Sequence, residues 1–249
     1  MSMPLLNLDK EWKKARDVKY IKNLLVVLGN PPYSVKSKNK DKKISELLET
    51  YKKGLNETKI NLDDDYIKFM RFAQWKLLEQ EKSHLFENNV GLMGFITNNS
   101  FLDGRTHRKM RESLFKSFDE IYILNLHGNN EKDAKEDENV FDIRVGVCIS
   151  LFVKHKSEPS KGAKIFYAST AQEGIFKRKE KFALLDRITK EGLLKSVRSL
   201  KFIKWQKLSL KAPYFWFVPK SFENTEYENF ISSKHIPNTT MQKHSLFMP

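Results

Sequence analysis

The residues with the clearest chemical meaning stand in a row, Asn30, Pro31, Pro32 and Tyr33, directly after the apolar run 24–29. Two consecutive prolines cannot donate ladder hydrogen bonds and hold the backbone extended, so a strand must end there. The amide oxygen of Asn30 and the carbonyl of Pro31 can accept hydrogen bonds from an amino group, and Tyr33 offers a flat face for a planar heterocycle. The tetrapeptide suits methylation of an amino group on a planar ring; the alternative is a turn that ends a strand.

The composition is that of a folded protein with a polar, basic surface. The 249 residues are 40% hydrophobic and carry a formal net charge of +14. The single cysteine, Cys148, lies in an apolar run, which favours a core position and argues against a disulfide framework, so no metal site is expected. No apolar run approaches membrane-spanning length and no signal peptide pattern opens the chain, so we expect a cytoplasmic protein without a membrane partner.

The positive charge is concentrated in two segments. Residues 34–59 contain 8 basic and 4 acidic residues, and residues 154–220 contain 17 and 5. The stretch 61–140 between them contains 11 and 15. Basic segments of this kind favour a polyanion as partner, because Lys and Arg that neutralise phosphates release counterions. A generally lysine-rich composition would explain the charge equally well.

The pattern of apolar residues predicts an α/β protein. Buried strands are expected at 24–29, 90–97, 120–126, 145–154 and 163–169. Helices are expected at 9–22, 63–85, 105–118 and 176–196. Residues 34–59 read as a long basic loop with a short amphipathic piece near 44–52, and residues 127–139 as a solvated acidic loop. Because helices separate most strands, we expect a largely parallel sheet with an antiparallel pair at its C-terminal side.

Four segments resemble, in their order along the chain, those of N6-adenine DNA methyltransferases of restriction–modification systems, and most of all the single-chain type ISP enzymes. They are GNPPY, FITNNSFLDG, IYILNLHGN and VFDIRVGVCISLFVK, within a resemblance that covers about residues 20–220. The resemblance implies a partial Rossmann-like class I methyltransferase sheet, the C-terminal half of the catalytic domain, over residues 1–170. It also implies that residues 171–249 form a connecting and incomplete target-recognition region.

The resemblance assigns a role to each residue of the tetrapeptide. Asn30 and the Pro31 carbonyl would hold the amino group of an adenine flipped out of the duplex, with Pro32 fixing the backbone and Tyr33 stacking on the ring. Phe141 matches a second aromatic residue that packs on the extruded base, with an ordinary core position as the alternative. Three polar residues at the end of the second strand would line the same crevice, or form a plain turn: Asn98, Asn99 and Ser100.

Double-stranded DNA is the partner that the resemblance implies. The candidate contacts are Lys36, Lys38, Lys40, Arg105, Arg108, Lys177, Arg178 and Lys179. His107, Lys109 and Arg111 are further candidates for phosphate contacts, although a solvated helix face is the alternative for the whole helix. The mixture of aromatic and lysine residues in 199–219 suits DNA, and it suits packing against the catalytic domain just as well.

The chain departs from the family pattern at the cofactor site. Family members bind S-adenosylmethionine at a glycine-rich turn after an earlier strand, but only 29 residues precede Asn30 and no Gly-x-Gly occurs in the chain. We therefore expect a fragment with an exposed sheet edge, inactive alone or completed by a chain with the cofactor-binding half. The alternatives are a non-catalytic DNA-binding module and a methyltransferase for glutamine amides of proteins, which also uses NPPY; the basic region beyond residue 154 argues against the latter.

Overall fold

The computed structural model describes residues 8–20, 22, 24–33, 37–57, 62–79, 90–129, 136–155, 161–194 and 203–220. Residues Met1–Pro219 form one compact unit and Lys220–Pro249 a second, of which Lys220 alone is described. All the helices and strands named below belong to the first unit. The boundary expected at residue 170 stays a prediction.

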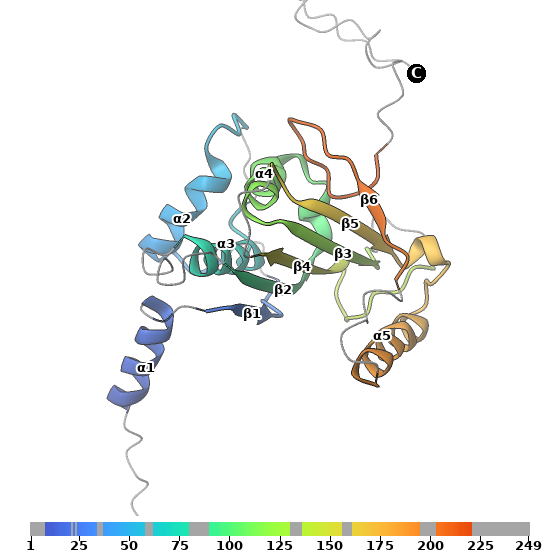
Figure 1. The fold of residues 1–249 in the computed structure, drawn as a ribbon, viewed down its shortest axis with the longest axis horizontal. Coiled ribbons are helices and arrows are strands. Elements are labelled where there is room, and N and C mark those ends of the chain that lie inside the picture. Colours follow the sequence, from blue (N-terminus) through green and yellow to red (C-terminus); the bar gives the residue numbers. More distant parts are fainter. Residues whose placement is uncertain are drawn as a thin grey trace, which may run out of the picture. The chain divides into compact units, whose positions relative to one another are not determined.

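Six strands of the described chain form one mixed sheet in the order β1-β2-β4-β3-β5-β6 (Figure 1). They are β1 (Val26–Gly29), β2 (Gly91–Asn98), β3 (Glu120–His127), β4 (Val147–Lys154), β5 (Lys164–Ser169) and β6 (Gln206–Leu208). The β1–β2 and β3–β5 pairs are parallel, and the other three pairs are antiparallel. The α/β prediction is confirmed, but the prediction of a largely parallel sheet was wrong. The reason is that β4 lies between β2 and β3 and runs against both of them.

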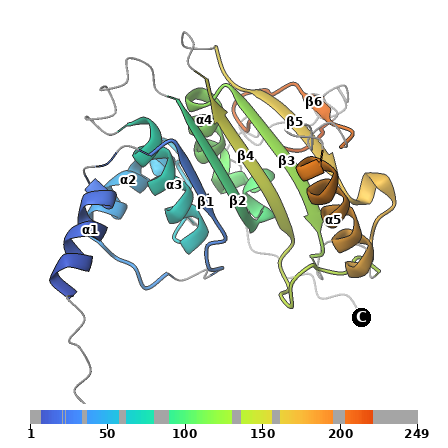
Figure 2. The same ribbon diagram turned by 60° about the horizontal axis from the view of Figure 1, so that its bottom comes forward.

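The helices of the described chain cover both faces of the sheet. They are α1 (Leu8–Tyr20), α2 (Lys42–Lys52), α3 (Asp65–Leu78), α4 (Arg108–Ser117) and α5 (Arg178–Leu194). Helices α2, α3 and α4 belong to one face, and α5 lies on the opposite face (Figure 2). The five predicted strands and the four predicted helices are thus found, although α3 is shorter than predicted and residues 80–89 lie outside the described part of the chain.

The larger hydrophobic core lies between the sheet and helices α2, α3 and α4. Met93 of β2 and Phe152 of β4 are fully buried there, in one cluster with Met70 of α3 and Leu114 of α4. Full burial of such a side chain contributes about 1.5–3 kcal/mol relative to exposure. Cys148 belongs to the same cluster, as the sequence predicted.

Helix α2 occupies the middle of the segment 34–59, where a long loop with a short amphipathic piece was expected. Asp41 accepts a hydrogen bond from the backbone N of Ile44 at 3.3 Å and so caps the helix. The buried residues of α2 are spaced for one face of a helix: Ile44, Leu47, Leu48 and Tyr51. The amphipathic piece expected near 44–52 is therefore confirmed as a helix, and the expectation of a loop was wrong for this part of the segment only.

Strand β1 is present where the sequence predicted it. The sequence predicted a buried strand, however, and β1 is partly exposed. Among the described strands it lies at the edge of the sheet and pairs with β2 alone. Val26 and Leu28 remain 50% and 69% exposed, respectively. An exposed sheet edge was expected from the sequence, and β1 provides it.

Arg111 of α4 is fully buried and joins the turn just before this helix to a segment about 100 residues further along the chain. Its guanidinium donates to the carbonyls of Phe101, Gly104, Tyr214 and Phe215 at 2.6–2.9 Å. It also lies 4.8 Å from the ring centre of Trp216. Since Arg111 has no access to solvent, the sequence-based prediction of a phosphate contact was wrong for this residue.

Replacing Arg111 with Met should lower the free energy of unfolding by about 3 kcal/mol or more, because four buried carbonyls lose their donor. Arg111→Lys should also destabilise the protein, since one ammonium cannot replace the planar fork of donors. Urea unfolding at pH 7 measures both variants. The exposed Arg105→Met serves as the control; equal stability of the Arg111 and Arg105 variants would refute the role assigned to Arg111.

Candidate functional site

The tetrapeptide lies directly after β1, at the carboxyl end of the β1–β2 parallel pair. Asn30 and Pro32 are exposed, Pro31 is buried and Tyr33 is partly buried. The Tyr33 hydroxyl lies 3.3 Å from Oδ1 of Asn30 and 3.4 Å from the carbonyl oxygen of Ile96, and it can donate to either. The ring of Tyr33 is thereby held across the ends of β1 and β2, beside the Asn30 amide.

Burial raises the pKa of the Tyr33 hydroxyl to about 12, with a smaller contribution from the nearby Cys148. The phenol therefore stays neutral at physiological pH. A neutral phenol donates hydrogen bonds and presents an uncharged ring, which is the form suited to stacking on a base.

The three polar residues at the end of β2 divide between a turn and a cavity. Asn98 accepts a hydrogen bond from the backbone N of Ser100 at 2.8 Å and caps the short 3-10 turn Asn99–Leu102. Asn99 donates to Oδ1 of Asn125 at 3.0 Å. Asn98 thus shapes the backbone, as the alternative reading proposed, whereas Asn99 and Ser100 line a cavity.

That cavity has a volume of about 570 Å³ and lies where β2, β3 and β5 end. Its polar walls are tied together: Asn125 donates to the Tyr167 hydroxyl at 3.1 Å, and His127 Nε2 lies 2.6 Å from Ser169 Oγ. None of these four residues was predicted from the sequence to belong to a functional site. The signal was available in the placement of Asn125 and Ser169 at the carboxyl ends of predicted strands.

No residue of the tetrapeptide lines this cavity, so the structure brings together only part of the predicted crevice. Phe141 is partly buried and packs, as does Ile96, against the smaller hydrophobic cluster. Its members are Leu124, Leu126, Val140, Val147 and Ala168. Ile96 therefore connects the two predicted base-stacking residues, because its carbonyl contacts Tyr33 and its side chain packs on the cluster that supports Phe141.

The predicted DNA contacts before α5 occupy different environments. Lys36 lies outside the described residues. Lys38 is exposed, and Lys40 is exposed and pairs with Asp63 at 2.7 Å. Arg105 is exposed, whereas Arg108 pairs with Glu57 at 2.7 Å and donates to the carbonyl of Leu55. These internal contacts occupy the Arg108 guanidinium.

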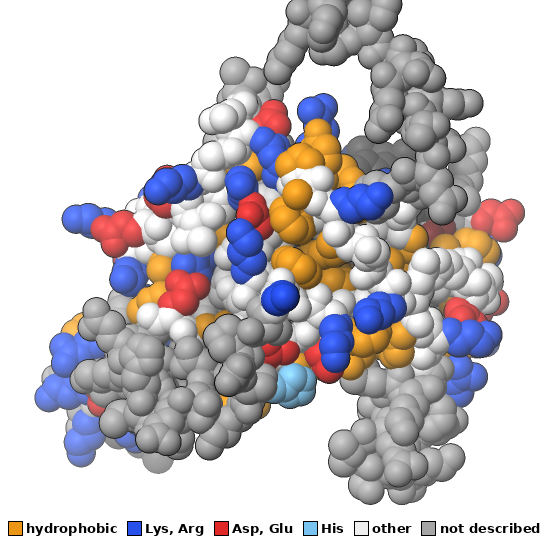
Figure 3. All heavy atoms as spheres, turned by 45° about the horizontal axis from the view of Figure 1, so that its top comes forward, with side chains coloured by type: hydrophobic (Ala, Val, Ile, Leu, Met, Phe, Trp, Pro, Cys, Tyr) orange, Lys and Arg blue, Asp and Glu red, His pale blue; other side chains and the backbone are white. Residues whose placement is uncertain are grey.

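The three predicted contacts near α5 differ in the same way. Lys179 is exposed, and Lys177 lies 3.5 Å from Glu138. Arg178 donates to the carbonyls of Asn139 and Phe141 and is therefore committed to the protein itself. In Figure 3, Lys and Arg side chains are spread around a central group of apolar side chains rather than gathered in one stripe.

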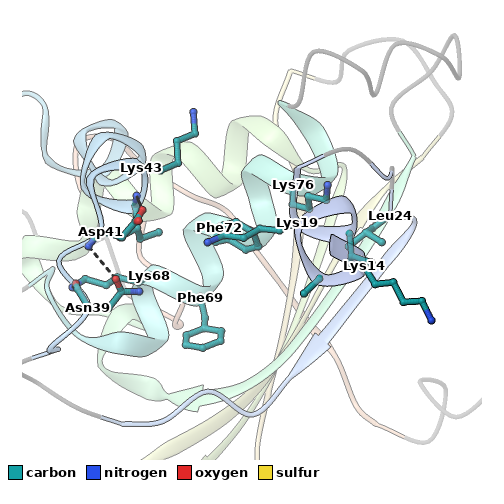
Figure 4. Close-up of a pocket in the computed structure, with 13 residues that line it drawn as sticks. Lys14, Lys19, Leu24, Asn39, Asp41, Lys43, Lys68, Phe69, Phe72 and Lys76 are labelled. Carbon is teal, nitrogen blue, oxygen red and sulfur yellow. Dashed lines mark hydrogen bonds between the residues drawn. The ribbon is translucent and has the colours of Figure 1, made fainter. Parts of the chain in front are cut away.

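A second, larger cavity of about 820 Å³ lies between α1, α2 and α3 (Figure 4). Val18, Ile44 and Phe72 contribute apolar surface. The basic residues around it are Lys14, Lys19, Lys43, Lys68 and Lys76. None of the predicted site residues lines this cavity, so it is separate from the candidate base crevice.

Comparison with known proteins identifies the class. The family model of the Eco57I restriction-modification methylase matches residues 8–132, about half of the chain. The chain therefore belongs to the Eco57I restriction-modification methylase family. No curated protein matches the chain. The family assignment confirms the restriction–modification methylase that the four segments predicted.

Solved structures of restriction-modification enzymes share the fold of this chain. The chain is 26% identical to the protein in the cryo-EM structure of the DrdV–DNA complex, with a TM-score of 0.67 over 88% of this chain and 20% of that one. It is 27% identical to the ATP-dependent type ISP restriction-modification enzyme LlaBIII bound to DNA, with a TM-score of 0.66 over 87% of this chain and 14% of that one. The likeness to type ISP enzymes and the α/β methyltransferase fold are confirmed.

A nuclease-deletion mutant of the type ISP enzyme LlaGI, in complex with a DNA substrate mimic, shares the fold at 24% identity, with a TM-score of 0.64 over 84% of this chain and 19% of that one. The chain spans a fifth or less of the length of each of these three proteins. Within the described residues, no helix has the length and apolar character needed to cross a membrane.

His107 is buried, so the prediction of a phosphate contact was wrong for this residue as well. Its Nε2 lies 3.4 Å from the Tyr66 hydroxyl, which also lies 3.4 Å from Ser100 Oγ. Burial, and to a lesser degree the nearby Arg111, lower the pKa of His107 from 6.5 to about 4. The imidazole is therefore neutral at pH 7 and supports the Ser100 side of the cavity as a neutral group.

The His107 shift predicts a loss of stability in acid. Below pH 6.5 the unfolded chain binds a proton that the folded chain binds only near pH 4. The free energy of unfolding should therefore fall by about 2 kcal/mol between pH 6.5 and pH 4.5 from this residue. Urea unfolding across this range should show a shallower fall for His107→Leu than for the exposed His155→Leu; identical pH profiles would contradict the assignment.

Proposed function

We propose that this chain carries the target-base half of a site-specific DNA methyltransferase that modifies the N6 atom of adenine. The observation that carries the proposal is the position of Asn30 and Tyr33 directly after β1, in a chain of the Eco57I restriction-modification methylase family. The carboxyl ends of strands in an α/β sheet are the usual place for a ligand.

The tetrapeptide has the groups that an extruded adenine requires. The adenine amino group donates to Oδ1 of Asn30 and to the Pro31 carbonyl, which directs its nitrogen lone pair away from the ring plane. Tyr33 stacks on the base, and stacking on an aromatic side chain contributes about 1–3 kcal/mol per base. Phe141 packs on the base from a second side, and extrusion from the duplex exposes the amino group to both.

Double-stranded DNA is the proposed partner. The two proteins at 26% and 27% identity are both named as DNA complexes or DNA-bound. Lys38, Arg105 and Lys179 are exposed and are the candidates for phosphate contacts in the described chain. The cytoplasm, where the DNA substrate is found, is the proposed location.

The proposed methyl donor is S-adenosylmethionine, as expected for a methylase family, and when bound it would supply the methyl group for the adenine nitrogen. The chain has no Gly-x-Gly turn to cradle this cofactor, and the free edge of β1 lies on the side where further strands would continue the sheet. No residue of this chain is therefore assigned to the cofactor. A complementing polypeptide with the cofactor-binding half is part of the proposal.

A non-catalytic DNA-binding module is the second candidate function. It is favoured by the same lack of a glycine-rich turn. Modification of glutamine amides in proteins is disfavoured by the restriction-modification methylase family and by the basic region beyond residue 154.

Calorimetric titration with S-adenosylmethionine, with and without duplex DNA, tests whether the isolated chain is a half-site or holds a complete active site. We expect DNA to bind and the cofactor to show no binding heat with the isolated chain, because the glycine-rich cradle is missing. Cofactor binding with micromolar affinity would contradict the half-site and would mean that this chain holds a complete active site.

In the enzyme completed by the cofactor-binding polypeptide, Asn30→Ala should reduce the transfer of tritiated methyl groups to DNA at least 100-fold, because one acceptor for the reacting amino group is lost. Removal of comparable catalytic hydrogen bonds lowers the rate by about 10²–10³. DNA affinity, measured by fluorescence anisotropy, should change less than twofold. The exposed Asn56→Gly, at a position with a φ of +50° that glycine accepts, provides the control. Equal turnover in the Asn30 and control variants would exclude the proposed role of Asn30.

A further inference from the structure

The turn at residues 137–142, which carries Phe141, is attached to the beginning of α5. The backbone N of Glu138 donates to the carbonyl of Phe176 at 2.9 Å, just before the helix. The backbone N of Arg178, the first residue of α5, donates to the Glu138 carboxylate at 2.9 Å. The turn and the helix are about 40 residues apart in the sequence, so these contacts are tertiary.

A buried ion pair strengthens this attachment. Lys181 of α5 pairs with Asp137, and their side chains are 0% and 3% exposed. The ammonium of Lys181 also donates to the carbonyl of Glu138 at 2.7 Å. Two charges are stable away from water only when each satisfies the other, so this pair specifies one position of the turn relative to the helix.

Arg178 contacts the part of the turn that contains Phe141. Its Nε donates to the carbonyl of Asn139 at 2.7 Å, and its Nη2 donates to the carbonyl of Phe141 at 3.3 Å. Its Nη1 pairs with Asp142 at 2.8 Å. Three consecutive contacts to one short segment leave the Phe141 backbone little freedom.

Asn139 connects the same turn to the sheet. Its side-chain amide donates to the carbonyls of Gly128 and Val145 at 2.9 and 2.7 Å, where β3 ends and just before β4 begins. Its Oδ1 accepts a hydrogen bond from the backbone N of Phe141 at 2.9 Å. Gly128 has a φ of +83°, and a Cβ there would lie 2.9 Å from the backbone N of Asn139, so the close approach requires glycine.

We propose that Arg178 and Lys181 are positioning residues that hold Phe141 at the target-base crevice. This inference rests on the proposed function, since it assigns to Phe141 the role of packing on the extruded base. Arg178 acts through the backbone of the turn rather than through DNA phosphates. Because Arg178 and Lys181 of α5 contact the backbone of the turn, a displacement of α5 would also move the segment that carries Phe141.

Amide hydrogen exchange of the full chain tests the attachment directly. Lys181→Met and Arg178→Lys should each accelerate exchange at the backbone N–H groups of residues 138–142 at least tenfold, while exchange in β3 and β4 stays unchanged. Asp186→Asn, an exposed position on the same helix, is the control. The double variant Lys181→Met/Asp137→Met removes both buried charges and tests whether the fold survives without them. Unchanged exchange at 138–142 in both single variants would overturn the proposal.

A fluorescent base tests the consequence for the crevice. The probe is a single-stranded thymidine oligonucleotide with one 2-aminopurine, whose base is unpaired and requires no recognition sequence. We expect Phe141→Ala and Arg178→Lys to reduce the quenching of the bound probe at least twofold, with the exposed α5 variant Asp186→Asn unchanged. If Phe141→Ala alone changes the quenching, the positioning role is refuted. If exchange accelerates but no variant, Phe141→Ala included, affects the probe, the base-stacking role in the proposed function fails and the positioning role with it.

Discussion

The placement of β4 between β2 and β3 is the constraint on which the candidate site depends. Because β4 runs against both neighbours, its first residue lies at the same end of the sheet as the last residues of β2 and β3. That end therefore collects the tetrapeptide after β1, the turn after β2, the end of β3 and the turn that carries Phe141. Had β4 paired parallel to β2, the Phe141 turn would lie at the opposite end, away from Asn30 and Tyr33.

Local features of the site and fold could be predicted from the sequence, and long-range features could not. The double proline identifies the end of β1, and apolar runs identify five of the six strands, because both signals lie within a few residues. The pairing of β4 with β2 joins residues more than 40 positions apart, as do the His127–Ser169 and Lys181–Asp137 contacts. Nothing in the local pattern encodes these contacts. The amphipathic stripe of α2 was predicted, but it was read as part of a loop because the segment around it is dominated by lysines.

Several of the basic residues that contribute to the net positive charge contact groups of the protein itself. Arg111 and Lys181 are fully buried, and Arg108 and Arg178 are engaged by carboxylates and carbonyls of the protein. These basic residues stabilise particular turns and do not form part of an external field. The proposed electrostatic attraction for DNA would therefore rest on fewer side chains than the net charge suggests, and the salt dependence of binding would report that smaller number.

The open edge of β1 has a consequence for the behaviour of the protein in solution. Its backbone N–H and C=O groups on the side away from β2 have no strand beside them in the described chain, and Val26 and Leu28 next to them are exposed. Such an edge is a template for strand addition between molecules. Self-association of the chain will therefore increase with protein concentration, and a polypeptide that continues the sheet will act as its solubilising cap.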